Sequence, residues 1–503
     1  MTIGSWRRLI PMLLVVFFLA TLGGLSSSVG AKTLGFVTFP GPGTHAEFTQ
    51  RLVEEWAKQN GHVIRSQVVP FVQLRDKIMV TMIARDPSVD FYYVDSGPYP
   101  LFAHGLAPLN DFIVRDKLDL SAIAKPLLDV FTVEGKSHSI PHESDTSLLV
   151  YRDELFSDAT ERRNFRQKYG RDLTPPKTFD EMMQVAEFFT RKKGEPLAGK
   201  PLEDSLYGVA LSGRTYISTT RLFQMFLHGA GARTFDGNLC PAFNGEGAQK
   251  ALQFFVDLVN KGFAVPGVMT TGTPEIVVLM NEGRAAMSAT YPTGIGIGSR
   301  PGFRYKSAPW YPATTKAWGL AIAEHSKNKE EVWSLIKFMI QKDTQMRFGL
   351  KSAGLGAEPT RSDVLRDPKL LAERPTLAAM AETHERSIPQ TNIPEMAYVW
   401  DIQAEPIADV LVNKMPVKAA LDKAVGKTYK LLQDAGYYEG KPRCANVPCG
   451  QTAPPSHPPS GCERLTGDRE AQPFTCGGLG RVGPHAAGRS PWGLHRTPVP
   501  EDE

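Results

Sequence analysis

The stretch Ser139–Phe156, SIPHESDTSLLVYRDELF, decides the fold, together with Thr315–Asn328, TKAWGLAIAEHSKN. The first is an apolar run that carries Glu143 and Asp145 where it begins, and the second is an apolar strand with Trp318 at its mouth. Carboxylates accept hydrogen bonds from hydroxyl groups, and an indole face covers apolar C–H groups. Strands that present acids and an indole at one end therefore favour a cleft for a polyhydroxylated ligand.

Strand and helix patterns alternate on the N-terminal side of this stretch. The pattern predicts strands at 33–39, 62–69 and 89–94, and helices at 45–56 and 73–84. Such alternation is typical of an open parallel α/β sheet, in which ligands bind beyond the carboxyl ends of the strands. We expect the 40–44 loop and Asp95 on that rim. Apolar spacing predicts further helices at 178–189, 245–260, 331–341 and 417–435. A capping box at Thr178–Glu181 opens the first of them.

Length and charge limit the class of protein. The chain has 503 residues, too many for a single core, so two or more lobes are expected. The formal net charge is only +4, without a face-wide basic block, which disfavours a nucleic-acid partner.

The first 31 residues have the pattern of an export signal. Arg7 and Arg8 precede the apolar run Leu9–Leu22, and Ser28–Ala31 offers small residues for cleavage. The run is short for a membrane-spanning helix, although a retained anchor is the alternative. We therefore expect a protein exported to the periplasm.

The composition changes near residue 439. Residues 441–503 contain 11 Pro and 9 Gly but only 7 Leu, Ile, Val and Phe, so 439–503 is predicted to be a disordered tail. Four of the five cysteines lie there, and their spacing fits no standard zinc pattern. Only Cys240 precedes the tail, which predicts a body without an internal disulfide, stabilised by core burial. We expect no metal and no cofactor.

The chain lacks the common catalytic motifs HExxH, GxSxG and GxxxxGK[ST]. The glycines of Thr293–Gly298 resemble a dinucleotide loop only superficially, and we interpret them as a flexible loop. A pair of carboxylates for glycoside hydrolysis stays open as an alternative.

Several segments, in order along the chain, carry a family resemblance. They are Val89–Asp95 with Gly105–Leu109, Ile140–Phe156, Pro175–Phe179, Phe243–Phe255, Met280–Met287, Trp318–Ile322 with Lys327–Lys329, and Pro359–Arg361 with Asp367–Pro368. In these segments, residues 32–438 resemble the bacterial extracellular solute-binding proteins of family 1, the sugar-binding receptors of ABC importers.

The resemblance implies a two-lobe periplasmic-binding-protein fold, type II-like, with three crossover hinge segments near 140–146, 309–317 and 350–358. The first lobe would comprise 32–142 with 312–350, and the second 143–311 with 351–438. The lobes would close on a sugar by a hinge motion, and the closed form would dock on a permease in the inner membrane. We expect a monomer.

Three candidate ligand-binding residues match positions of the family. Asp145 matches its ligand acid, Trp318 matches its stacking tryptophan, and Tyr291 stands where relatives often carry tryptophan, although Ala289–Pro292 departs from the family pattern. Their structural alternatives are a hinge hydrogen bond for Asp145 and ordinary burial for Trp318.

The residues themselves suggest the other candidates. Asp95 follows a buried strand at the rim, where it would bind hydroxyls or cap the next turn, and Glu143 would share the side of Asp145 in an extended strand. Two further candidates are Arg75 and Arg361, whose guanidinium groups could donate hydrogen bonds to hydroxyls. Their alternatives are surface charge and a structural salt bridge. The last two candidates, Thr44 and His45, stand at a helix start.

The sequence therefore favours a receptor without catalysis that captures a monosaccharide, disaccharide or polyol for an ABC permease. The alternatives are the same fold binding glycerol phosphate or another solute, a secreted glycosidase, and a receptor that presents its ligand to a sensory partner. The acidic candidates weigh against glycerol phosphate.

Overall fold

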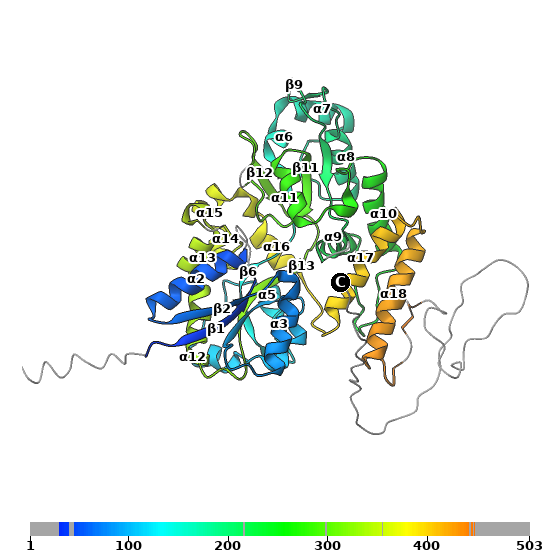
Figure 1. Ribbon diagram of the computed structural model, residues 1–503. Coiled ribbons are helices and arrows are strands. Elements are labelled where there is room, and N and C mark those ends of the chain that lie inside the picture. The colour runs from blue at the N-terminus through cyan, green and yellow to red at the C-terminus, as the bar shows by residue number, and fades with distance from the viewer. Residues whose placement is uncertain are drawn as a thin grey trace, which may run out of the picture.

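The computed structural model describes residues 30–39, 45–214, 217–296, 299–354, 356–441, 444, 445 and 447. Two sheets with their own helices form two lobes (Figure 1). Residues 1–29 of the predicted signal peptide lie outside the described part. Within that part, no helix is both long enough and apolar enough to cross a bilayer.

The first lobe contains a five-stranded sheet in the order β2–β1–β3–β14–β6. The first three strands along the chain are parallel, as predicted. The later strand β14 runs antiparallel to both β3 and β6, so the sheet is mixed rather than fully parallel. The bounds are β1 Thr33–Thr38, β2 Val63–Val68, β3 Phe91–Asp95, β6 Ser139–Ser144 and β14 Ala317–Ile322.

Helices cover this sheet because each carries an apolar face at helical spacing. In α2 (His45–Gln59) the buried face includes Leu52 and Trp56. α3 (Phe71–Ile83) contacts β1, and α12 (Lys329–Met339) contacts both α2 and β14. The predicted helices at 73–84 and 331–341 are therefore present, each shifted by about two residues toward its N-terminus.

The second lobe contains a four-stranded sheet in the order β10–β11–β7–β12, in which β7 runs antiparallel to both of its neighbours. Its strands are β7 Leu148–Arg152, β10 Tyr207–Ala210, β11 Ala285–Thr290 and β12 Tyr305–Ala308. Its main helices are α8 Phe179–Phe189, α9 Ile217–Gly229, α10 Glu246–Asn260, α11 Thr273–Asn281, α17 Met396–Leu411 and α18 Val417–Asp434. α17 contacts α9, α10 and α18, as Figure 1 shows at the lower right of this lobe.

Local sequence explains where these helices begin. Thr178 caps α8 by accepting a hydrogen bond from the Glu181 backbone N–H at 3.2 Å, as the predicted capping box requires. The Glu181 carboxylate accepts from the backbone N–H of Lys177 rather than that of the cap residue. The capping-box prediction is thus confirmed for one of its two hydrogen bonds.

Short elements complete the fold. They are η1 Tyr99–Leu101, η2 Ala103–Gly105, α4 Asn110–Arg115, α5 Lys125–Asp129, β4 Thr132–Val133, β5 Lys136–Ser137, α6 Asp153–Ser157, α7 Ala159–Tyr169, β8 Pro196–Leu197, β9 Lys200–Pro201, η3 Val268–Thr270, β13 Thr314–Thr315, α13 Lys342–Gly349, η4 Lys351–Ala353, α14 Ser362–Leu365, α15 Pro368–Glu373, η5 Pro375–Leu377, α16 Met380–Arg386 and β15 Ile388–Pro389.

The chain passes between the lobes more than once. It leaves the first sheet at the end of β6 and enters the second at β7, and it returns between β12 and β14. A third passage follows α13, because Phe348 packs in the core of the first lobe and Leu350 in that of the second. The short strands β13 and β15 pair in parallel at the junction. The predicted two-lobe α/β architecture is confirmed.

One disulfide joins Cys240 of the second lobe to Cys444, which lies 204 residues later. Cys444 and Val447 are each 4% exposed and pack against the core of that lobe. The prediction of a disordered tail from residue 439 is therefore wrong for these residues, and the body is cross-linked through Cys240 to the segment that composition assigned to the tail. Composition assigned Cys444 to the tail because the Pro-rich sequence begins only three residues earlier. Residues 448–503 lie outside the described part.

Candidate functional site

The ends of β3, β6 and β14 bring two acids and an indole together. Trp318 of β14 lies opposite Asp95 of β3 on one side and opposite Glu143 of β6 on the other. The register shifts directly after Trp318, between Trp318 and Gly319. Three residues that the sequence placed at the ends of separate strands thus meet on one edge of the first lobe's sheet.

Trp318 is only 1% exposed, because its indole packs among aromatic rings. Its ring centroid lies 4.8 Å from that of Tyr93, 5.4 Å from Phe39 and 6.0 Å from Phe71. The indole Nε1–H donates to Oδ2 of Asp145 at 3.3 Å. Trp318 therefore combines core packing with a polar contact to the first crossover.

Lys316 is the charge that holds the acids in place. Its Nζ lies 2.5 Å from Oδ2 of Asp145 and 3.2 Å from Oδ2 of Asp95, and its side chain is 5% exposed. Burial favours the neutral amine, but the charges of Asp145 and Asp95 outweigh burial and raise the pKa of Lys316. The ammonium group of Lys316 is therefore a buried cation that pairs with both predicted ligand acids, Asp145 and Asp95.

Glu143 has a different partner from the other two acids. Its Oε2 accepts a hydrogen bond from the Tyr93 hydroxyl at 2.6 Å, and its side chain is buried. Burial and, after it, the Glu143 charge raise the pKa of Tyr93 well above its ordinary value. Next to them, the Thr49 hydroxyl lies 3.0 Å from Nε2 of His142. Glu143 thus belongs to a hydrogen-bonded group on the first lobe.

The second lobe contributes Tyr291, which follows β11 and is 9% exposed. Its hydroxyl has no hydrogen-bond partner among the described residues. Burial, with the nearby charge of Asp145, raises the pKa of Tyr291, and the charges of Lys316 and Arg221 oppose that rise. Thr290 of β11 pairs with Leu148 of β7, so Tyr291 lies beside the segment that carries Asp145.

Arg221 of α9 is 4% exposed, an unusual degree of burial for a guanidinium. Its Cζ lies 4.0 Å from the centre of the Trp400 ring, and its Nη2 donates to the Gln390 side chain at 3.3 Å. Within the described part of the chain, Nε and Nη1 have no hydrogen-bond partner. Burial lowers the pKa of Arg221, and Tyr291, Asp95 and Asp145 counteract that effect.

Trp400 of α17 touches the first lobe directly. A Cβ added to Gly97 would lie 2.2 Å from the Trp400 ring and 3.3 Å from Oδ1 of Asp95, so only glycine fits there. The Gly97 backbone N–H donates to the same Oδ1 of Asp95 at 2.9 Å. The side chain of Gln390 adds a second contact between the lobes by donating to the Ser96 carbonyl. The lobes are therefore closed on each other at this point.

Glu358 lies on the third passage between the lobes and is 1% exposed. Its Oε1 accepts a hydrogen bond from the Thr293 hydroxyl, and its backbone carbonyl accepts from the Ser144 N–H at 2.8 Å. Burial raises the pKa of Glu358 to about 8, and the charge of Asp145 contributes, against the opposing effect of Thr293. Glu358 is therefore protonated at neutral pH.

A cavity of about 160 Å³ adjoins this group on the side of the second lobe. Gln390, which binds Arg221, also lines the cavity, and Gln224 and His228 follow Arg221 along α9. Burial lowers the pKa of His228 to about 4, so its ring is neutral at pH 7. The described residues provide no partner for Gln224 Oε1 or for Thr314 Oγ1, both of which belong to lining residues.

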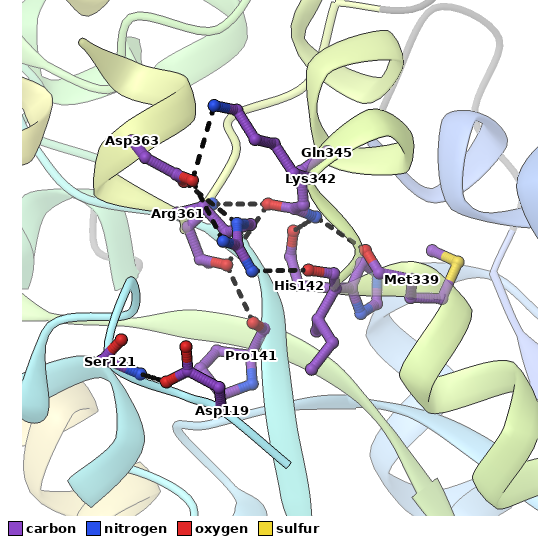
Figure 2. Close-up of polar contacts among 11 residues, drawn as sticks. Asp119, Ser121, Pro141, His142, Met339, Lys342, Gln345, Arg361 and Asp363 are labelled. Atoms are coloured by element: carbon purple, nitrogen blue, oxygen red, sulfur yellow. Dashed lines mark hydrogen bonds and ion pairs between the residues drawn. The ribbon is translucent and has the colours of Figure 1, made fainter.

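The structure thus brings together Asp95, Asp145, Glu143, Trp318 and Tyr291, five of the nine predicted residues. Arg361 lies elsewhere. Figure 2 shows its guanidinium turned toward Asp363. Two N–O distances of 3.0 Å join the two side chains, and Nη1 of Arg361 also donates to the Ile340 carbonyl. The observed contacts of Arg361 match the alternative to ligand binding, which was a structural salt bridge.

Arg75 lies on the exposed face of α3, paired with Asp76 at 3.3 Å. Its Cζ is 5.9 Å from the centre of the Tyr398 ring on α17, so it faces the other lobe at the rim rather than the buried group. Thr44 lies outside the described residues, and so does the side chain of His45.

Sequence reasoning missed Lys316, Arg221, Trp400 and Glu358. Lys316 carried a signal, because it is a charge next to an apolar strand and two residues before Trp318. The sequence around Arg221 carried no such signal, because an arginine on a helix is usually exposed. Within the described residues, no group of three or more His, Cys, Asp or Glu side chains is arranged to hold a metal ion.

Two lobes closing on a buried polar group define a bilobal binding protein, and comparison with known proteins gives its family. The model of the family named bacterial extracellular solute-binding protein matches residues 42–346, more than half of the chain. The chain belongs to this family.

Individual relatives are distant. A probable amino-acid ABC transporter periplasmic-binding protein from Sinorhizobium fredii is 23% identical over 313 residues, which cover 60% of this chain and 66% of the relative. A mannitol-binding protein from Pseudomonas aeruginosa is 26% identical over 219 residues, 40% of this chain and 44% of the relative.

Among solved structures, maltose-bound MalE3 of T. maritima superposes with a TM-score of 0.65 at 22% identity, covering 80% of this chain and 100% of that chain. At this identity the similarity establishes the shared fold. The match to the first of the relatives above spans just under two thirds of its length.

Proposed function

We propose that this protein is the exported, periplasmic receptor of an ABC importer. It binds a monosaccharide, disaccharide or polyol between its lobes, delivers the ligand to permease subunits in the inner membrane, acts as a monomer and has no catalytic activity. Family membership supports the receptor role, since the members are extracellular solute-binding proteins. The names of two similar proteins, mannitol-binding and maltose-bound, support a hydroxylated ligand.

One observation carries the proposal. Charged and aromatic side chains from both lobes converge where the lobes touch: Asp95, Lys316 and Trp318 from the first, Arg221, Tyr291 and Trp400 from the second, and Asp145 between them. Carboxylates and guanidinium groups bind hydroxyls with charge-assisted hydrogen bonds of about 1.5–3 kcal/mol each, and aromatic rings cover the apolar face of a sugar. Because the residues come from both lobes, a ligand bound there favours the closed form.

A second candidate ligand class is an amino acid, which the name of the relative from Sinorhizobium fredii suggests. A glycosidase is the enzymatic alternative and requires two carboxylates at the scissile bond. Turnover of aryl glycosides by the purified protein would contradict the absence of catalysis.

A thermal-shift screen of the purified protein tests the ligand class. The panel contains neutral sugars, polyols and their acidic derivatives, with L-amino acids as the competing class. The proposal expects at least one hydroxylated compound to raise the melting temperature in a concentration-dependent way. A screen in which only amino acids raise it would overturn the proposal.

A further inference from the structure

The unpaired polar atoms of Arg221, Trp400 and Tyr291 share one property, which is that they can all donate hydrogen bonds. Arg221 leaves Nε and Nη1 without a partner among the described residues, and the same holds for Trp400 Nε1 and the Tyr291 hydroxyl. All three side chains are at least nine-tenths buried. A buried donor without a partner costs about 1–3 kcal/mol, so a ligand that accepts these hydrogen bonds gains that free energy.

The acids of the first lobe do not accept hydrogen bonds from these donors. Asp95 and Asp145 share the ammonium group of Lys316, at 3.2 and 2.5 Å. Arg221, by contrast, forms no ion pair with any described residue, and its contact with Trp400 is through the ring face. The second lobe therefore presents a buried cation whose hydrogen-bonding capacity is only partly used.

A neutral hydroxyl group always brings an O–H donor together with its acceptor oxygen, whereas an ionised carboxylate or phosphate supplies acceptor oxygens without such a donor. The donors of Arg221 and Trp400 therefore match an anionic group better than they match a neutral polyol. Guanidinium is also the side chain best suited to carboxylate and phosphate.

The adjoining cavity adds neutral polar groups, among them Gln224, the neutral imidazole of His228 and Thr314, beside one further arginine, Arg233. Gln224 Oε1 and Thr314 Oγ1, both without a partner in the described part of the chain, accept hydrogen bonds from hydroxyls. Gln390 connects this cavity to Arg221.

We propose that the ligand is an acidic hydroxylated compound, either a sugar acid or a phosphorylated polyol. Its anionic group binds Arg221, Trp400 and Tyr291, and its hydroxylated chain extends toward the cavity lined by Gln224, His228 and Thr314. This inference rests on the proposed function and narrows its ligand class. It also limits the argument from acidic residues, because Lys316 already pairs with Oδ2 of both Asp95 and Asp145, whereas Arg221 pairs with no described acid.

Calorimetric titration with matched pairs tests the inference on the unmodified protein. The pairs are D-gluconate with D-sorbitol, D-galacturonate with D-galactose, and glycerol 3-phosphate with glycerol. We expect at least one anionic member to bind at least 10-fold more tightly than its neutral partner. The carboxylate and phosphate pairs distinguish the two sources of negative charge.

Arg221→Met removes the charge and keeps an unbranched apolar chain beside Trp400. It should abolish the preference for the anionic member, whereas Arg386→Met, at an exposed arginine paired with Glu382, should retain it. Tyr291→Phe removes a single hydroxyl and should weaken anion binding several-fold, which provides a second test if Arg221→Met does not fold.

Three results would overturn the inference. Neutral members that bind as tightly as the anionic ones would contradict it and leave the receptor function intact. A preference that survives in both Arg221→Met and Tyr291→Phe would also contradict it. If neither neutral nor anionic hydroxylated compounds bind, the proposed function fails as well.

Discussion

The ammonium group of Lys316 lies 2.5 Å from a carboxylate oxygen of Asp145, at the first passage of the chain between the two lobes. Lys316 itself precedes β14, where the chain has just returned from the second lobe. The ion pair therefore ties two of the connecting segments together. A buried pair of this kind is costly to break, because the remaining charge stays without compensation.

Lys316→Met should destabilise the protein by about 3–5 kcal/mol, the cost of removing one partner of a buried pair. Urea unfolding followed by tryptophan fluorescence measures the change in the free energy of unfolding. The control is Lys418→Met, which removes an exposed pair with Asp422 and should cost under about 1 kcal/mol. Equal losses in the two variants would contradict the structural role of Lys316.

Gly97→Ala should reduce ligand affinity at least about 10-fold, because the added methyl group meets Trp400 when the lobes are closed. The φ angle of Gly97 does not lie in the left-handed region, so alanine should leave the stability of the separate lobes nearly unchanged. Small-angle scattering should show a more open molecule than the wild type. Trp400→Phe in the same chain should restore part of the closure; an alanine variant as compact as the wild type would show that this contact does not control closure.

Cys444→Ser should lower the free energy of unfolding by about 2–5 kcal/mol, because the disulfide to Cys240 closes a loop of 204 residues. Dithiothreitol should destabilise the wild type by a similar amount and leave the variant unaffected. Melting curves of both proteins with and without reductant measure this effect. A wild type that reductant does not destabilise would contradict the prediction.

Glu358 should make the protein less stable as the pH rises from about 5 to about 8. Its pKa is about 8 in the native state against an ordinary value of 4.5, so in this window the native state binds a proton that the unfolded state has lost. The slope from one such group is at most about 1.4 kcal/mol per pH unit. Urea unfolding at pH 5, 6.5 and 8 measures it.

Glu358→Gln should flatten that dependence, since glutamine keeps a similar shape and does not titrate. Glu382→Gln, at an exposed residue paired with Arg386, should retain the wild-type slope and serves as the control. Identical pH dependence in Glu358→Gln and the wild type would mean that Glu358 is already ionised in the native state.

Much of the fold follows from local sequence. Apolar spacing and capping residues such as Thr178 predict the helices, and the alternation of strands and helices predicts the first three parallel strands. The direction of β14 was beyond local reasoning, because an apolar strand such as Ala317–Ile322 pairs equally well either way. The disulfide of Cys444 was also beyond local reasoning, because its partner Cys240 lies 204 residues away in the sequence.

The site was predictable where a candidate side chain stands at or next to the end of an apolar strand, as Asp95, Asp145 and Trp318 do. It was not predictable where a helix of the second lobe turns an arginine inward. Arg221 has the sequence context of a surface residue, and only the packing of α9 against α17 buries it beside Trp400.

The central claim is that a hydroxylated small molecule binds between residues of both lobes. Isothermal titration calorimetry of the wild type, Asp145→Asn and Trp400→Ala, against the neutral and acidic sugars and polyols together with L-amino acids, tests it most directly. We predict that at least one hydroxylated compound binds the wild type at micromolar or lower Kd, and that each substitution, one beside Lys316 and one on the second lobe, weakens binding at least about 10-fold. Amino-acid binding without any response to hydroxylated compounds, or sugar binding unchanged in both variants, would contradict the claim.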